Sequence, residues 1–263
     1  MANAKQINPF YIPKSLLSVD ADAKTIKGNA YGYKTGILYL APSDISGAQL
    51  CPMASLAGCE EGCLYTAGRG AFSNVQEARL NKTRYFLGDR DAFMAHLCKD
   101  IEKLIRDAKK QGAIPVVRLN GTSDIRWENI QFTYTFANNK KRFVNIFEVF
   151  PEVQFMDYTK LANRKDIPKN YDLTFSYSGK AGFWEQNIKA VEAGMRLAVV
   201  FRKASDIPEI FLRKQVVNGD ESDLRFLEPQ GVVVALYAKG QAVKDSSGFV
   251  VDSFKNIPIE VRA

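Results

Sequence analysis

The chain of 263 residues is 46% apolar and 25% charged, and it carries a net charge of +7. This balance is that of an ordinary globular protein and excludes a disordered or collagen-like chain. Four cysteines in a chain of this length exclude the dense disulfide framework of a small secreted domain. The apolar runs are too short to span a bilayer, and residues 1–14 lack the pattern of a signal peptide. We therefore expect a soluble protein of a reducing compartment that has no membrane partner.

In chain order, the sequence predicts an N-terminal arm or cap followed by alternating strands and helices. Residues 1–30 are polar and interrupted by prolines, which favours the arm or cap. Apolar runs bounded by turn residues predict strands, and apolar residues repeating with the helical period predict helices. The predicted strands are 36–42, 114–119, 153–158, 173–177, 197–201 and 231–237, and the predicted helices are 73–87, 90–111, 129–147 and 183–193.

This alternation of strand, polar loop and helix indicates parallel α/β structure. The strands are continuously apolar, as expected when both faces of a sheet are covered. No linker divides the chain, so we predict one α/β domain over residues 1–263. A complete or partial (β/α) barrel is the first prediction, and an open doubly wound sheet is the alternative. In both folds the loops after the carboxyl ends of the strands carry the site.

Three of the four cysteines lie close together just after the first predicted strand. Cys51, Cys59 and Cys63 form a Cys-x7-Cys-x3-Cys run among glycines and a proline. An iron–sulfur cluster is held by thiolates from such loops, and three protein ligands leave one iron open. Structural zinc prefers four ligands and shorter spacings, and unconnected buried thiols are a third interpretation. The remaining candidates, Cys98 and His96, lie on a helix, where Cys98 fits the apolar core and His96 the surface.

Polar residues follow several predicted strands and are candidates for lining the rim of a binding site. An Arg within an apolar strand needs a partner or an anion, and the neighbouring amide, hydroxyl and carboxylate groups could bind a small molecule at the open iron. Ordinary capping turns are the alternative interpretation. The candidate rim residues are Arg118, Asn120, Thr122, Asp124, Asp157, Lys160, Ser178 and Arg202.

The stretch 219–225 and the overall charge of the chain each have two open interpretations. Residues 219–225 are acidic around one internal Arg, so they either close over a basic ligand or form a turn that satisfies its own charges. The basic excess of the whole chain is compatible with nucleic acid as a partner, although many soluble proteins have it too.

Several motifs resemble those of a family of bacteriophage and prophage proteins, the "gene product eighty-eight" type. The resemblance runs from about residue 30 to the end of the chain. It is carried by residues 35–42, the cysteine run with its Gly68-Arg69-Gly70 turn, residues 118–124, residues 157–160 and residues 219–227. It implies a viral source and a location in the cytoplasm of the bacterial host, with packaging in the virion left open.

The layout also resembles radical S-adenosylmethionine enzymes at a distance. In that superfamily a cysteine loop after the first strand of a βα barrel holds a [4Fe-4S] cluster, and the open iron chelates S-adenosylmethionine. The spacing differs, because the superfamily uses Cys-x3-Cys-x2-Cys. The resemblance therefore implies a cluster on Cys51, Cys59 and Cys63, and it leaves S-adenosylmethionine as a cofactor open.

Three hypotheses follow from the sequence. The first is a phage [4Fe-4S] protein with one open iron, in the extended form a radical-enzyme-like protein of unknown substrate. The second is a non-catalytic phage protein that the cluster stabilises and that contacts nucleic acid or another phage protein. The third is a protein with a structural zinc ion.

Overall fold

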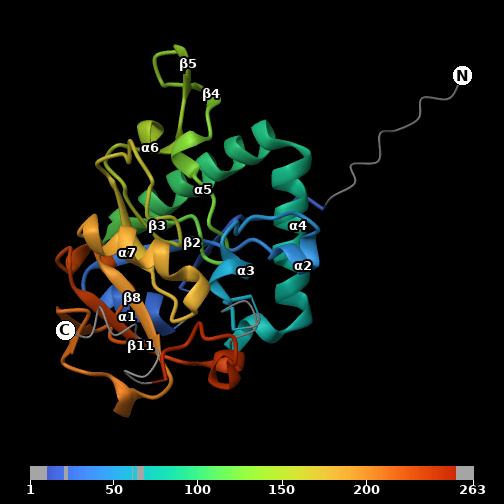
Figure 1. Cartoon of the computed structure of the whole chain (residues 1–263). Helices are drawn as coiled ribbons and strands as arrows, with labels where there is room; N and C mark the ends of the chain where they lie inside the picture. Colours follow the sequence, from blue (N-terminus) through green and yellow to red (C-terminus); the bar gives the residue numbers. More distant parts are fainter. Residues whose placement is uncertain (1–10, 21–22, 61, 64–67, 253–263) are drawn as a thin grey trace, which may run out of the picture.

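A computed structural model describes residues 11–20, 23–60, 62–63 and 68–252 (Figure 1). Its strands are β1 (Leu17–Val19), β2 (Tyr33–Leu38), β3 (Ile114–Arg118), β4 (Phe132–Thr135), β5 (Lys141–Val144), β6 (Gln154–Thr159), β7 (Tyr171–Ser176), β8 (Leu197–Phe201), β9 (Ile210–Phe211), β10 (Lys214–Asn218) and β11 (Val233–Tyr237). Its α-helices are α1 (Ala23–Ala30), α2 (Ser43–Ser46), α3 (Ala54–Ala57), α4 (Ser73–Gly88), α5 (Arg90–Lys110), α6 (Ile146–Val149) and α7 (Trp184–Glu192). Short 3-10 turns occupy Gly68–Ala71, Trp127–Asn129, Ala181–Phe183, Ala204–Asp206, Arg225–Leu227 and Gly240–Lys244.

A nine-stranded sheet in the order β1-β2-β3-β6-β7-β8-β11-β10-β9 runs through the molecule. The strands from β2 to β10 are parallel, and only β1 and β9 join antiparallel at the two edges. The prediction of an α/β protein with a large parallel sheet is confirmed. Among the described residues the sheet stays open, because β1 and β9 do not pair. From β2 to β11 the strands follow chain order, without the reversal that defines a doubly wound sheet.

The largest core lies between the sheet and helices α4 and α5, which stand on one side of it in Figure 1. Leu97, Ile101 and Leu104 of α5 form a buried stripe, as their helical spacing predicts, and they belong to the same core as Val117 of β3. Cys98 is 2% exposed within this core, which confirms its prediction as a small core residue. The helices cover this face of the sheet, and the loops that follow the strands lie at the carboxyl edge.

A second core lies under α7. It contains Phe175 of β7, Val199 of β8, Val233 of β11 and Ala190 of α7, all of them buried. Cys59 packs against its margin. The cysteine loop therefore rests on the sheet rather than standing away from it.

The helix predicted over residues 129–147 is wrong. The segment forms the β4–β5 hairpin followed by the short helix α6. Phe132, Tyr134 and Phe136 alternate with threonine and alanine, which is the period of a strand and not of a helix, and aromatic and threonine side chains favour strands. Asn139 has a φ of 61° in the turn, a conformation that asparagine tolerates.

The predicted arm over residues 1–30 is only partly within the described residues. Where it is described, it is not an arm: Leu17–Val19 is an edge strand of the sheet, and Ala23–Ala30 is a helix. The N–H groups of Leu16 and Leu17 donate to the Asp100 carboxylate of α5 at 2.6 and 3.0 Å, which ties this end of the chain to the core. The strand is too short for its periodicity to be read from the sequence.

Candidate functional site

The cysteine segment lies at the carboxyl edge of the sheet. It follows β2, whose last residue is Leu38, and it includes the one-turn helix α3 between Cys51 and Cys59. Gly58 closes α3 in the left-handed conformation, with φ of 69°. A Cβ at this position would lie 2.6 Å from Ser247 Oγ and 2.9 Å from Lys180 Cδ, so this turn of the cysteine segment requires glycine on both counts.

Four hydrogen bonds from other strand ends hold the cysteine segment in place. The main-chain Asp124 N–H donates to the Leu50 carbonyl at 2.7 Å. The Ser178 hydroxyl donates to the Ala57 carbonyl at 2.7 Å, and Lys180 Nζ donates to the Ser55 carbonyl at 3.0 Å. The Ser247 hydroxyl donates to the Gly58 carbonyl at 2.6 Å. The loops after β3, β7 and β11 thus all bind the same segment.

The three cysteines of this segment are half-buried and form no disulfide with another described residue, whereas Cys98 is buried elsewhere in the core. Burial raises the pKa of the Cys51 thiol, and the charges of Asp124, Cys63 and Cys59 act in the same direction. Burial also raises the pKa of Cys59, against the opposing charge of Lys160. The described residues contain no group of three His, Cys, Asp or Glu side chains already at metal-binding spacing. The thiols are therefore electrostatic neighbours without a preassembled ligand cage.

Lys160, which follows β6, carries a buried positive charge beside these thiols. Its Nζ donates to the Ser176 carbonyl at 2.8 Å and to the Ser176 hydroxyl at 3.0 Å, and it lies 4.7 Å from the centroid of the Phe249 ring. These partners are neutral, and no described carboxylate pairs with Nζ. Burial lowers the pKa of Lys160, whereas negative charge on Cys59, and then on Asp124, would raise it.

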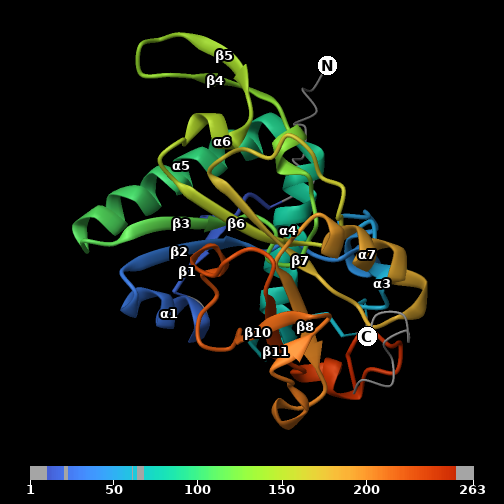
Figure 2. The ribbon, with the colours of Figure 1, turned by 60° about the vertical axis from the view of Figure 1, so that its left-hand side comes forward.

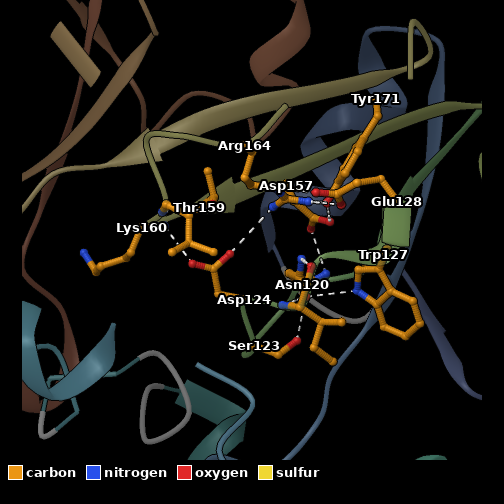
Figure 3. A network of polar contacts seen from close by, with 12 residues as sticks. Asn120, Ser123, Asp124, Trp127, Glu128, Asp157, Thr159, Lys160, Arg164 and Tyr171 are labelled. Carbon is orange, nitrogen blue, oxygen red and sulfur yellow. Dashed lines mark hydrogen bonds and ion pairs between the residues drawn. The ribbon is translucent and has the colours of Figure 1, made fainter. Parts of the chain in front are cut away.

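Asp124 engages Lys160 through the main chain rather than through the ammonium group. The Lys160 N–H donates to Asp124 Oδ2 at 2.7 Å, and the lysine side chain extends away from this contact in Figure 3. Asp124 Oδ1 faces Arg164 Nη1 at 3.7 Å as an ion pair without a hydrogen bond. Both carboxylate oxygens are thus directed at protein cations or N–H groups.

Asn120 and Asp157 lie in a buried polar network beneath the loops (Figure 3). Asp157 accepts from the Asn120 N–H at 2.7 Å and from the Tyr171 hydroxyl at 2.8 Å. The Asn120 side-chain oxygen accepts from Trp127 Nε1 at 3.0 Å and from the Ser123 hydroxyl at 2.8 Å. Burial raises the pKa of Asp157 to about 7, although the Arg118 charge and the hydrogen bonds oppose this. Here these two residues fix the shape of the loop after β3.

Arg118, Thr122 and Arg202 each have partners within the protein. Arg118 Nη1 pairs with Asp223 at 3.0 Å, and its guanidinium lies 4.8 Å from the centroid of the Tyr158 ring. The Thr122 hydroxyl donates to the Leu40 carbonyl at 2.6 Å. Arg202 pairs with Asp252 and donates to the carbonyls of the 242–245 turn. Of the predicted rim, the structure therefore brings Asp124, Lys160 and Ser178 to the cysteine segment.

The acidic stretch 219–225 is a turn that satisfies much of its own charge. Arg225 donates to the carbonyls of Gly219 and Ser222 and pairs with Glu228 at 2.9 Å. Its Asp223 is the partner of Arg118. Leu224 lies in a small core with Val116 and Met156, so the stretch covers one face of the sheet.

Several residues that shape the site are not predicted from the sequence. Arg164 reaches Glu128, with Nε to Oε1 at 2.9 Å, and its guanidinium lies 5.3 Å from the centroid of the Tyr171 ring. Ser247 lies 189 positions from the carbonyl that it binds. No local sequence pattern predicts such pairs, because each pair joins two loops that come together only in the folded chain.

A model of the family described as Gene product 88 matches residues 15–253. No curated protein and no solved structure matches. Across the described ranges, no helix is both long and apolar enough to cross a membrane. The family match includes the cysteine run and the strand-end motifs that carry the resemblance in the sequence, and the chain belongs to the Gene product 88 family, a phage gene-product family.

Proposed function

We propose that the protein binds a [4Fe-4S] cluster through Cys51, Cys59 and Cys63 and leaves one iron open to a small molecule. The observation that carries this proposal is the buried ammonium group of Lys160, which interacts electrostatically with three cysteines that are not in disulfides. A buried charge with only neutral partners is costly, and a nearby anion offsets that cost. Three thiolates and their cluster supply such an anion. The three thiols are not already arranged as a ligand cage, so the donor set and the buried charge of Lys160 are what support cluster binding.

Structural zinc fits the donor set less well. Zinc in structural sites takes four ligands, and the described residues offer the three thiols, with Asp124 as a further candidate because its charge acts on Cys51 and Cys59. Asp124 already accepts the Lys160 N–H and faces Arg164. A three-cysteine cluster needs no fourth protein ligand.

The strand order supports the finer proposal of a partial (β/α) barrel that resembles radical S-adenosylmethionine enzymes. Parallel strands follow chain order from β2 to β11, and the cysteine segment comes directly after the first of them. An open iron in such a cluster can bind a cofactor or substrate atom. The alternatives, a non-catalytic cluster protein and a zinc protein, are outcomes of the tests below.

The first test is iron and sulfide analysis of protein purified without oxygen. We expect about four irons per chain and the broad visible absorption of a cluster. Replacing Cys51, Cys59 or Cys63 by alanine should abolish both signals, whereas the control Cys98→Ala should keep them. Zinc at one ion per chain with no iron, or loss of the signal in Cys98→Ala as well, would contradict the proposal.

The second test concerns Lys160. Lys160→Met removes the buried charge, so cluster content should fall or the reduction potential should become more negative, because positive charge stabilises the electron-rich form. Lys82→Met is the matched control: Lys82 is also buried and also donates to a carbonyl, that of Leu16 at 2.7 Å, but it lies on α4. Equal effects of the two substitutions on iron content and reduction potential would show that Lys160 has no specific role at the cluster. Reductive cleavage of added S-adenosylmethionine would then separate an enzyme from a non-catalytic cluster protein.

A further inference from the structure

The β4–β5 hairpin projects from the body of the molecule in both views (Figures 1 and 2). Its strands pair antiparallel, from Phe132 opposite Val144 to Thr135 opposite Lys141. The turn is closed by the Phe136 N–H to Lys140 carbonyl bond at 3.0 Å. The hairpin is thus a regular two-stranded ribbon and not a loose loop.

One face of the ribbon holds it to the body. Phe132 is buried, and the rings of Phe132, Tyr134 and Phe136 contact one another edge to face, with centroids 6.4 and 5.0 Å apart. The Tyr134 hydroxyl donates to Glu102 of α5 at 3.3 Å. These contacts account for the aromatic residues of that face.

The opposite face has no such packing. Side chains alternate between the faces of a strand, so Thr133, Thr135, Lys141 and Phe143 share the outer face, and the register places Thr133 beside Phe143. Phe143 is 70% exposed. The ring of Phe143 takes no part in the aromatic contacts of the inner face, so packing against the body does not explain an aromatic residue at this position.

The ribbon is also the site of an unbalanced positive charge. Between Ile130 and Asn145 the chain has Lys140, Lys141 and Arg142 and no acidic residue. All three are exposed, and no described carboxylate pairs with them. Arg142 lies 5.7 Å from the centroid of the Phe136 ring. Some exposed lysines elsewhere do have carboxylate partners, as in the Lys103–Asp107 and Lys239–Asp220 pairs.

We propose that this hairpin binds single-stranded nucleic acid. Lys141 shares the outer face with Phe143, and the exposed Lys140 and Arg142 flank Lys141 in the chain. Together they provide the charge that phosphates require, and the exposed ring of Phe143 is a surface on which an unpaired base stacks. The adjacent threonine hydroxyls can donate to phosphate or sugar oxygens. Single strands are favoured over duplexes because the bases of a duplex are already stacked and do not present their faces to Phe143. The proposal is independent of the cluster.

The test is fluorescence anisotropy of the full chain with a labelled single-stranded oligonucleotide, as DNA and as RNA, and with a duplex of equal length. We expect the single strand to bind more tightly. The triple variant K140A/K141A/R142A should lose at least about tenfold in affinity, and its dependence on log salt should become shallower by about two, as expected for three lost phosphate contacts. Phe143→Ala should weaken binding about tenfold with little change in salt dependence.

The matched control is K189A/K203A/K244A, which removes the same charge from exposed positions outside the hairpin. It should change the affinity by less than about twofold at constant salt. Equal losses in the two triple variants would mean that only the net charge matters, and they would overturn the proposal. Absence of binding by the wild-type chain, or tighter binding of the duplex, would overturn it too. Unchanged circular dichroism and iron content in the variants exclude misfolding and loss of the cluster as the cause.

Discussion

Buried ionisable residues are concentrated where the loops meet the carboxyl ends of the strands. Arg118 is the last residue of β3, Asp157 lies in the second half of β6, and both are buried. Asp157 has no hydrogen bond from a cation, since its partners are a main-chain N–H and a tyrosine hydroxyl. Burial without such a contact explains why its pKa rises to about 7 while the Arg118 charge acts against the rise.

Asp157 should therefore make the stability fall as the pH rises. Below its ordinary pKa of 3.8 the carboxyl is protonated in both states, and between 3.8 and about 7 the unfolded chain releases the proton while the folded chain keeps it. Asp157→Asn should remove this loss, on the order of 4 kcal/mol at most. The measurement is the free energy of unfolding of metal-free protein by denaturant, near pH 4 and near pH 7. Identical pH dependence in the two proteins would contradict the expectation.

Arg196 is a buried charge that, in contrast to Asp157, pairs with a group of opposite charge. Its guanidinium pairs with Asp172 at 2.6 Å and donates to Thr174 Oγ1 at 2.9 Å and to the Glu228 carbonyl at 2.6 Å. Its side chain is 1% exposed. Truncation would remove this donor from the Thr174 hydroxyl and the Glu228 carbonyl, and it would leave the Asp172 carboxylate with the Gln230 side chain as a donor.

We expect Arg196→Ala to lower the free energy of unfolding by about 3–5 kcal/mol, since it breaks a buried ion pair. The control is Lys103→Ala, which breaks the exposed Lys103–Asp107 pair of α5 and should cost less than about 0.5 kcal/mol. Both values come from denaturant titrations at neutral pH. Similar small costs for the two substitutions would show that the Arg196 contacts contribute little.

At the scale of elements, helix α5 and the β4–β5 hairpin differ in how much of their structure is local. Helix α5 begins at an N-cap, Asp89, whose carboxylate accepts from the Ala92 N–H at 3.0 Å, and it carries its apolar stripe over its whole length. The hairpin strands are four residues each. Two or three alternations of apolar and polar residues are too few to distinguish a strand from a helix in the sequence. That is why the first was predicted correctly and the second was not.

Removal of the α5 cap should have a cost that a conservative substitution avoids. Asp89→Ala leaves the Ala92 N–H without its side-chain acceptor and should destabilise the protein by about 1 kcal/mol. Asp89→Ser keeps an acceptor and should cost only a fraction of that. Thermal and denaturant unfolding of the two variants measure the difference. A cost for Asp89→Ser as large as for Asp89→Ala would indicate that the charge, and not the hydrogen bond, is what matters.

At the scale of the molecule, the cysteine segment is held by residues far away in the chain. Ser178 and the Ala57 carbonyl that it binds are 121 positions apart, and Ser247 binds Gly58 across an even longer separation. Buried hydrogen bonds of this kind contribute modestly to stability but strongly to the position of the loop. We attribute the placement of the thiols to these contacts.

Ser178→Ala should loosen the cysteine segment more than it destabilises the protein. The substitution removes two hydrogen bonds, the one to the Ala57 carbonyl and the one that the hydroxyl accepts from the Lys180 N–H at 3.2 Å, and should cost about 1–2 kcal/mol globally. Amide hydrogen exchange in residues 54–60 should become faster, while exchange in α5 should change only by the global amount. Ser205→Ala is the control, because Ser205 is exposed and its hydroxyl donates to the neighbouring Asp206. Unchanged exchange in the cysteine segment would show that Ser178 does not hold it.

The sequence by itself determined the class of fold, the long helices, most parallel strands and the family. Each of these depends on local periodicity, on caps such as Asp89, or on motifs of a few neighbouring residues. It also identified the cysteine run and its position after the first parallel strand, because spacing along the chain is visible without a structure.

Only the tertiary structure decided how the candidate rim is used. Arg118, Thr122 and Arg202 are engaged by Asp223, Leu40 and Asp252, whereas Lys160 is left with neutral partners beside the thiols. The physical reason is that the partners of a buried charge come from segments distant in sequence, and its burial exists only once they have packed together. The same holds for the outer face of the hairpin, which became recognisable only when the register paired Phe143 with Thr133.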